Sequence, residues 1–533
     1  MLGSEYSRNK VRMDSTLKCI LLLFSIYIAV NAASVKADFG HCKIAVKEWA
    51  ASSLDHQVKQ DKHTLKDLLF FLHVPRTGGR AYFHCFLRKL YSKSQECPHS
   101  YDKLQFDPSK TKCGLLATHD DYSLMSKLPM EKTSVVTVLR NPIDRVFSTY
   151  EFSVEVAARF LVQPNLTSVK QMTGRRHTTR TNAVDEGFFT LPNLTSVKQM
   201  TGHMHTTRTN RVSTLNIWPW KYLVPWMRED LFVRRDVRKL SGIDDIKSSD
   251  PYNMEDVLMP LEKFINDPIA HDIVHNGATF QIAGLTNNSY LANSHKVRHC
   301  VQKYKVLGKY VLQVAKKRLD NMLYVGLTED HRNSATMFAN VVGAQVISQR
   351  VASNATGEGA ANMKSEQSSF FPDTELDNND QQNSTSDKKV AETASTKSTA
   401  KNGENMTVGK LMEAYEVCIS NLRVEQARRR IVSLEEISPA NFTKEARLQV
   451  PEAVLQQIRS LNSLDLDLYE YAQGIFAKQH REYTDNLLAM GGLENMFGNN
   501  LWKLTMWAVL LVLLFLFLLF ENARREKTSK VKI

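Results

Sequence analysis

Three short apolar runs near the start of the chain have the pattern of buried β-strands. The first, Leu68–Leu72, is apolar at every position, which is typical of a parallel strand covered on both faces. Two similar runs follow at 114–118 and 134–139. Apolar residues at helical spacing occupy 81–90 and 143–152, after the first and third runs. This alternation predicts an α/β fold with a central, mainly parallel sheet that is flanked by helices.

Two later segments have helical patterns. Apolar residues recur at helical spacing over 411–431, and a cluster of arginines lies at the end of that segment. A further helix begins at Asn462 or Ser463, since each is a favourable residue for a helix N-terminus. Between 351 and 406 apolar residues become sparse and polar residues dominate, so we predict a disordered insertion there.

The N-terminal region has the features of a secretory signal. Lys18 precedes an apolar run over 19–30, which is too short to span a bilayer comfortably. Val30 and Ala32 fit the small residues that precede a cleavage site. We therefore predict a cleaved signal peptide at 1–33, and the alternative is an uncleaved signal anchor.

The C-terminal region has the pattern of a membrane anchor. Residues 504–520 carry no charge, and several basic residues follow at once. Basic residues on that side of a span favour the cytosol. We predict a stem at 484–500, a transmembrane helix at 501–520 and a cytoplasmic tail at 521–533. Signal and anchor together predict a single-pass type I membrane protein with a luminal body.

Charge and glycosylation signals bear on the partners and the compartment. The formal net charge of +13 favours anionic partners, but charge alone does not distinguish nucleic acid, nucleotides, sulfated glycans and acidic peptides. Seven N-x-S/T triplets support a luminal, glycosylated protein. They begin at Asn165, Asn193, Asn287, Asn354, Asn383, Asn405 and Asn441.

The cysteines agree with an oxidising compartment. Of the seven cysteines, Cys19 lies in the predicted signal, and six remain. An even number allows disulfides, although six cysteines permit 15 pairings. None of them has the spacing of a metal site, so no metal is expected.

One segment of the chain is repeated. Residues 164–174 recur unchanged at 192–202. We interpret 164–210 as a duplicated surface loop, because surface loops tolerate insertions; an error in the gene model is the alternative. The predicted luminal parts are an N-terminal segment at 34–65, the α/β core at 66–350 and its helical completion at 407–483.

The loop that follows the first strand suits an anion. The glycines at Gly78 and Gly79 let the backbone approach a ligand closely, and the N-terminus of the next helix favours negative charge. Arg76 adds a guanidinium group suited to phosphate. The spacing of a Walker A loop is absent, and a plain tight turn is the alternative. The candidate residues are Arg76, Thr77, Gly78, Gly79 and Arg80.

A second pair of residues strengthens the hypothesis of an anion site. Arg140 ends the third apolar run, and Ser148 lies in the helix after it. Open α/β sheets bind ligands at the C-terminal ends of their strands. An arginine and a hydroxyl placed there suit one phosphate group; the alternatives are a salt-bridged arginine and an ordinary exposed serine.

These segments resemble the Golgi carbohydrate sulfotransferases, especially the heparan sulfate 6-O-sulfotransferases. Residues 68–87 resemble their 5′-phosphosulfate loop, and 135–152 resemble their 3′-phosphate motif. Residues 114–125 are similar to the segment with their catalytic histidine, and 314–338 and 464–479 resemble their later helices. The resemblance implies the P-loop-like sulfotransferase fold, with PAPS (3′-phosphoadenosine 5′-phosphosulfate) as co-substrate and no metal.

A closer resemblance is to the plant type of tyrosylprotein sulfotransferase. It rests on residues 217–232, on the type I arrangement and on the C-terminal anchor. It implies sulfation of tyrosine in secreted peptides and proteins with acidic flanks, at the Golgi membrane, with no nucleic-acid partner. A glycan 6-O-sulfotransferase and an inactive membrane-anchored binding protein are the alternatives. The basic residues that suit acidic flanks are Arg228, Arg234, Arg235, Arg238 and Lys239, with a solvated helix face as the alternative.

The resemblance also implies roles for single residues. His119 is the candidate general base, with Asp120 or Asp121 to orient it; a structural histidine is the alternative. Arg76 stabilises charge on the leaving phosphate, and Thr77, Gly78, Gly79 and Arg80 bind the 5′-phosphosulfate. Arg140 and Ser148 bind the 3′-phosphate. Thr328 is expected nearby, and the tryptophans at 218, 220 and 226 are expected in the core rather than in an acceptor cleft.

Overall fold

The computed structural model describes residues 20–24, 36–55, 63–98, 112–162, 214–242, 250–355, 406–437 and 440–529. The chain divides into two compact units, residues 1–472 and 473–533. The first unit contains the sheet and all of the predicted site residues.

Four parallel strands form one sheet in the order β2-β1-β3-β4. Their bounds are Leu68–Leu72 for β1, Leu115–Thr118 for β2, Thr133–Leu139 for β3 and Tyr324–Leu327 for β4. Every residue in these strands is buried, which explains their largely apolar composition. The predicted parallel sheet is confirmed, and β1, β2 and β3 begin and end within one residue of their predicted bounds. Their C-terminal ends lie along the same edge of the sheet.

The strand β4 was not predicted. Its residues fall within 314–338, which we compared with helices of the carbohydrate sulfotransferases. The structure instead has a strand between α10 (Gly308–Asp320) and α11 (His331–Phe338). Because β4 has four residues and one of them is Gly326, its pattern is too short to mark a strand.

Helices account for most of the rest of the described chain. Residues 36–55 are helical, and the segment at Gly79–Leu90 combines α-helical and π-helical turns. The predicted helices at 143–152 and 411–431 lie inside the longer α4 and α13. Besides α10 and α11, the helical elements in chain order are α2 (Gly79–Tyr82), a π-helical turn (Phe83–Leu87), α3 (Arg88–Leu90), α4 (Pro142–Val162), α5 (Trp220–Ser241), α6 (Leu261–Asn266), α7 (His271–Val274), α8 (Gly277–Ile282), α9 (Ser294–Lys303), a π-helical turn (Ala339–Gly343), α12 (Ala344–Ala355), α13 (Val408–Leu434), α14 (Lys444–Leu448), α15 (Glu452–Leu461) and α16 (Ser463–Ser529). Short 3₁₀ turns occupy Tyr122–Lys127, Met130–Lys132, Thr214–Asn216, Lys305–Leu307 and Glu435–Ile437.

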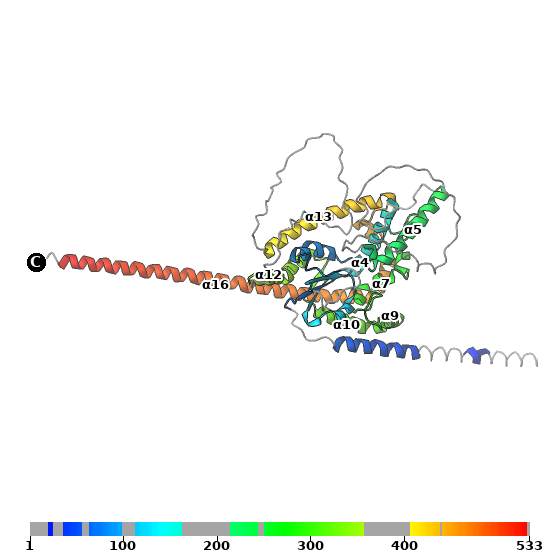
Figure 1. The fold of residues 1–533 in the computed structure, drawn as a ribbon, viewed down its shortest axis with the longest axis horizontal. Helices are drawn as coiled ribbons and strands as arrows, with labels where there is room; N and C mark the ends of the chain where they lie inside the picture. Colours follow the sequence, from blue (N-terminus) through cyan, green and yellow to red (C-terminus); the bar gives the residue numbers. More distant parts are fainter. Residues whose placement is uncertain are drawn as a thin grey trace, which may run out of the picture. The chain divides into compact units, whose positions relative to one another are not determined.

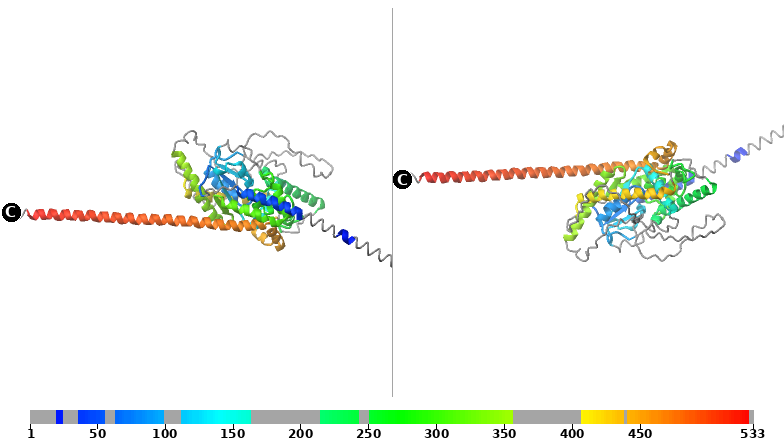
Figure 2. Two further views of the ribbon diagram at one scale, coloured as in Figure 1. Left: turned by 90° about the horizontal axis from the view of Figure 1, so that it is seen from below. Right: turned by 90° about the horizontal axis from the view of Figure 1, so that it is seen from above.

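The helix α13 lies beside the segment that follows β1, although more than 300 residues separate them in sequence. Figure 1 shows α13 on one side of the strands and α9 and α10 on the other, and α13 lies in front in the right-hand view of Figure 2, which is seen from above. The ring of Tyr415 on α13 stacks on Phe86, with ring centroids 4.0 Å apart. A disulfide between Cys85 and Cys418 joins the same two elements.

All six cysteines of the predicted luminal body form disulfides. Cys42 pairs with Cys300 and joins helix 36–55 to α9. Cys97 pairs with Cys113, close by in sequence. Together with the Cys85–Cys418 bond, these disulfides select one of the 15 pairings that the sequence allowed.

Several predicted segments lie wholly or mostly outside the described residues. These are the signal peptide at 1–33, of which 20–24 are described as helical, and the duplicated loop at 164–210. The insertion predicted from 351 is also outside from residue 356 to 405, while α12 continues to Ala355.

The second unit contains the rest of α16. The predicted stem at 484–500 and span at 501–520 are helical, and side chains within that span are described over 506–516. Among the described residues, we find no helix with a stretch that is both long and apolar enough to cross a membrane.

Candidate active site

The loop after β1 requires glycine at two positions. Gly78 has a φ of 80°, in the left-handed region that residues with a Cβ rarely adopt. A Cβ atom on Gly79 would lie 2.3 Å from Cδ2 of His73, so the helix α2 begins in close contact with the end of β1. Thr77 closes the turn, because its Oγ1 donates a hydrogen bond of 2.8 Å to the carbonyl of Val74. The two glycines therefore allow the loop to turn tightly and its backbone to pack against the His73 ring.

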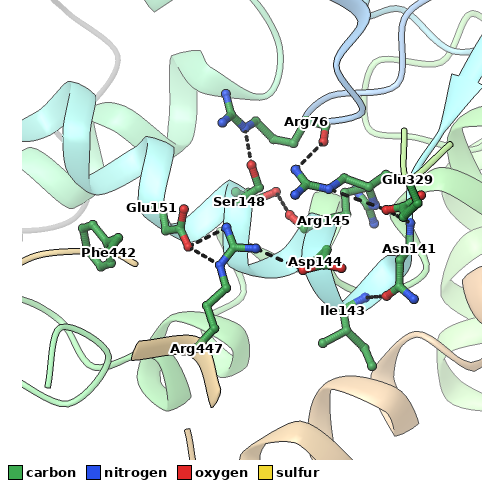
Figure 3. Close-up of polar contacts among 12 residues, drawn as sticks. Arg76, Asn141, Ile143, Asp144, Arg145, Ser148, Glu151, Glu329, Phe442 and Arg447 are labelled. Atoms are coloured by element: carbon green, nitrogen blue, oxygen red, sulfur yellow. Dashed lines mark hydrogen bonds and ion pairs between the residues drawn. The ribbon is translucent and has the colours of Figure 1, made fainter. Parts of the chain in front are cut away.

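The structure brings Arg76, Arg140 and Ser148 together, as the sequence predicted. The Nε atom of Arg76 donates to Oγ of Ser148 at 3.0 Å (Figure 3). Arg140 donates from Nη1 to the carbonyl oxygen of Arg76 at 3.2 Å. The Arg76 guanidinium lies over the ring of Phe152 at 4.4 Å. Burial, together with repulsion from Arg140, lowers the pKa of Arg76 to about 10, so the guanidinium is still charged at neutral pH. A bound anion would stabilise this buried positive charge.

Ion pairs fix the position of α4, the helix that carries Ser148. Arg447 of α14 donates from Nε to Glu151 at 2.8 Å and from Nη1 to Asp144 at 3.0 Å (Figure 3). Glu151 also accepts a hydrogen bond of 2.8 Å from the Tyr252 hydroxyl. Because Asp144 and Glu151 lie on either side of Ser148 in the helix, these bonds hold the serine at the strand ends.

Thr328 connects the loop to the sheet. It follows β4, and its Oγ1 lies 2.6 Å from the carbonyl oxygen of Thr77 and 3.0 Å from that of Leu139. Its expected place near the site is confirmed. Its hydroxyl bridges the loop after β1 and the last residue of β3.

His119 directly follows β2, and a backbone carbonyl contacts its ring. Its Nδ1 is 3.1 Å from the carbonyl oxygen of Trp218. A carbonyl only accepts hydrogen bonds, so Nδ1 carries the proton and the neutral ring keeps a lone pair on Nε2. Burial, with a smaller effect of Arg76, lowers the pKa of His119 to about 4. His119 is therefore neutral at physiological pH and able to accept a proton.

These residues line one cavity of about 580 Å³. His119, the loop, Arg140 and Ser148 contribute to it, and so does a face of α13 that the sequence did not connect with the site. Seven arginines and one glutamate line the cavity, so it is strongly positive. The arginines are Arg76, Arg80, Arg140, Arg159, Arg423, Arg429 and Arg430, and the glutamate is Glu155. A larger cavity of about 720 Å³, lined partly by helix 36–55, contains none of the predicted site residues.

No family model matches the chain. The chain is 54% identical over 538 residues to the protein-tyrosine sulfotransferase of Arabidopsis thaliana. The match covers 98% of this chain and all of that protein. The chain belongs to the protein-tyrosine sulfotransferases. The family inferred from the motifs is thereby confirmed.

In this protein-tyrosine sulfotransferase, a backbone carbonyl orients His119, and sequence reasoning missed it. Trp218 is buried, as predicted, but its carbonyl contacts the site. Of the two predicted orienting carboxylates, Asp121 accepts hydrogen bonds from the backbone amides of Ser123 and Thr286 at 3.0 and 2.9 Å, so it joins two loops. Asp120 accepts from the Tyr290 hydroxyl at 3.3 Å and from Asn288.

Gln281 is a further residue that sequence reasoning missed. It lies on α8, and its Nε2 donates to the carbonyl oxygens of His119 at 2.8 Å and His73 at 3.2 Å. One amide group therefore ties together the ends of β1 and β2, each of which contributes a histidine to the cavity. The two histidine rings lie edge to face, with centroids 4.5 Å apart.

The basic stretch of α5 is largely engaged within the protein. Arg234 forms a two-bond ion pair with Asp230, at 2.8 and 3.0 Å. Arg235 pairs with the neighbouring Asp236 at 2.8 Å, and Arg228 lies over the ring of Phe160 at 4.8 Å. These contacts within the protein favour the alternative, a solvated helix face, over the predicted docking surface.

Among the residues that the structure describes, no three histidine, cysteine, aspartate or glutamate side chains are grouped to bind a metal ion.

Proposed function

We propose that the chain transfers the sulfo group of PAPS to the phenolic hydroxyl of tyrosine in secreted peptides and proteins. The observation that carries this proposal is one positive cavity that combines a neutral, oriented His119 with the cluster of Arg76, Arg140 and Ser148. The identity to the Arabidopsis enzyme supports tyrosine as the acceptor.

The residues of the cavity fit the donor. Arg76 and Arg140 are close enough to repel one another, which a polyanionic ligand would relieve. Arg76, Thr77, Gly78, Gly79 and Arg80 would bind the 5′-phosphosulfate, where the glycines admit close approach. Arg140 and Ser148 would bind the 3′-phosphate, the group that distinguishes PAPS from other adenine nucleotides. When bound, PAPS supplies an electrophilic sulfur and a stable leaving group.

The reaction requires one proton to leave the acceptor. A tyrosine phenol has a pKa of about 10, so a base must take its proton as the new bond forms. Nε2 of His119 would accept that proton while the phenolic oxygen bonds to sulfur. The bond from sulfur to the bridging oxygen breaks at the same time, and adenosine 3′,5′-bisphosphate leaves. Arg76 would balance the charge that develops on the leaving phosphate.

We also propose a Golgi location, with the catalytic unit luminal and a C-terminal anchor. The uncharged run at 504–520 with basic residues after it supports the anchor. Three disulfides support an oxidising compartment. Two asparagines that begin glycosylation triplets, Asn287 and Asn441, are exposed. Acceptors with acidic flanks agree with the positive cavity.

An acceptor assay tests the central proposal. The full chain is incubated with PAPS labelled in the sulfo group and with either a tyrosine peptide or heparosan. We expect label in the tyrosine peptide and none in a matched peptide with phenylalanine. Label in heparosan alone would overturn the proposal in favour of a glycan sulfotransferase, and no transfer to either would favour an inactive binding protein.

Protection in sealed vesicles tests the location. We expect the catalytic unit to resist added protease and to shift in mass with a glycosidase. Digestion of the catalytic unit in intact vesicles would contradict the luminal placement.

A further inference from the structure

Arg429 of α13 lines the cavity with most of its donors unused. Its side chain is 8% exposed, and Nε donates to the carbonyl oxygen of Glu425 at 3.3 Å and lies 3.8 Å from the carboxylate of the same residue. Within the described part of the chain, neither Nη1 nor Nη2 of Arg429 has a hydrogen-bond partner, although both are buried. A buried guanidinium with unbonded donors is costly, so this arrangement suits the arrival of an anion.

A second buried arginine lies beside it. Arg159 of α4 donates from Nε to Ser433 at 3.0 Å and pairs with Glu155 at 2.6 Å. Its Nη1 is also buried with no hydrogen-bond partner among the described residues. The Ser433 hydroxyl also donates to the carbonyl oxygen of Arg429 at 2.6 Å, so it connects the two residues. Burial, with repulsion from Arg80 and Arg159, lowers the pKa of Arg429 to about 10, although Glu425 and Glu155 act in the opposite direction. We call Arg159 and Arg429 the α13 arginine site.

This site lies far from the residues assigned to the 3′-phosphate. Ser148, Phe152, Glu155 and Arg159 line the cavity along one face of α4. Arg159 follows Ser148 by 11 residues, which corresponds to about 16 Å along a helix at 1.5 Å per residue. The cavity therefore has two cationic ends, and one phosphate cannot occupy both.

Two aromatic side chains line the cavity beside α4. Phe152 contacts the edge of Trp220 with ring centroids 4.6 Å apart, and both line the cavity. Trp220 lies two residues after Trp218, whose carbonyl oxygen contacts the His119 ring. An acceptor tyrosine placed at His119 would thus have the 3′-phosphate toward Ser148, whereas the α13 arginine site lies further along α4, near Arg80 of the loop.

We propose that Arg429, with Arg159 beside it, binds the side-chain carboxylate of an aspartate or glutamate close to the target tyrosine. A carboxylate is the anion that an unmodified acceptor peptide carries, and an arginine fork matches its two oxygens. The proposal rests on the proposed function and assigns acidic recognition to α13. The cations of α5 are a poorer choice because none of the five lines this cavity, and the terminal nitrogens of Arg234 and Arg235 already contact aspartates of their own helix.

Peptide pairs test the proposal on the full chain. Each peptide carries one aspartate at a single position from three before to three after the tyrosine, and its partner has asparagine there. For the best position, we expect kcat/KM to favour aspartate by about tenfold, as for one charge-assisted hydrogen bond. In Arg429→Gln this preference should fall below about twofold, and Arg429→Lys should restore part of it.

Two further measurements make the result decisive. Arg428→Gln removes the same charge from the adjacent, exposed position of α13 and should keep the preference. Adenosine 3′,5′-bisphosphate should bind Arg429→Gln within about twofold of its affinity for the unmodified chain. The melting temperature should fall only slightly, because the substitution removes the contacts of Nε with Glu425 but no bond to the Nη atoms. An unchanged aspartate preference in Arg429→Gln would overturn the proposal. A tenfold loss of bisphosphate affinity with the preference intact would assign Arg429 to the donor, whereas failure of the unmodified chain to sulfate any peptide would count against the proposed function itself.

Discussion

Nδ1 of His119 lies 3.1 Å from the backbone carbonyl oxygen of Trp218. This relationship selects the tautomer of the ring, because the carbonyl can only accept a hydrogen bond. It leaves Nε2 as the basic atom in a cavity that also contains Arg76. A main-chain group thus performs the orienting role that a carboxylate performs in many catalytic histidine pairs.

The pH profile should report the environment of His119. Burial lowers its pKa to about 4, and the ring is an effective base only when it is neutral. We therefore expect kcat/KM to stay constant from about pH 5 to 8 and to decline as the pH falls through about 4. Steady-state assays with a tyrosine peptide across this range provide the measurement. An acid limb near the ordinary histidine pKa would show that a different or an exposed group is the base.

Substitution of Gly79 should disturb the loop after β1. In Gly79→Ala the added Cβ would lie 2.3 Å from the His73 ring, so the loop or the ring must move. We expect the free energy of unfolding to fall by about 1–3 kcal/mol, as at other overpacked sites. The affinity for adenosine 3′,5′-bisphosphate should also fall. Thermal unfolding and calorimetric titration measure the two effects. Gly40→Ala is the matched control, since a Cβ there meets nothing within 4 Å, and equal behaviour of the two variants would refute the tight approach.

Arg140 should distinguish nucleotides by their 3′-phosphate. In Arg140→Gln we expect the affinity for adenosine 3′,5′-bisphosphate to fall by about tenfold or more, because a charge-assisted contact is lost. The affinity for adenosine 5′-phosphate should change much less. Competition binding with the two nucleotides gives the comparison, and Arg332→Gln, at an exposed position on α11, is the control. An equal loss for both nucleotides would place Arg140 at the 5′-phosphosulfate instead.

Much of the sheet and part of the site could be predicted from local pattern. The runs at β1, β2 and β3 are apolar because those strands are buried on both faces, and this leaves a clear signal. Arg76 and Arg140 follow parallel strands, and such strands end at the same edge of a sheet, so their meeting was foreseeable.

The contributions of Trp218, Gln281 and Arg429 could not be predicted in this way. The carbonyl of Trp218 leaves no side-chain signal, and Gln281 reaches two strand ends from a helix more than 150 residues away. Arg429 reaches the cavity because α13 packs beside the segment after β1, where the Cys85–Cys418 bond joins them. Such contacts depend on tertiary packing rather than on local pattern.

The variant His119→Ala gives the most direct test of the account. Sulfo transfer from labelled PAPS to a tyrosine peptide is measured together with the affinity for adenosine 3′,5′-bisphosphate, and exposed His295 is replaced by alanine as the control. We predict that kcat falls by about 10²- to 10⁴-fold, as when a general base is removed, while bisphosphate binding is retained. Full transfer activity in His119→Ala would contradict the assignment of His119 as the base.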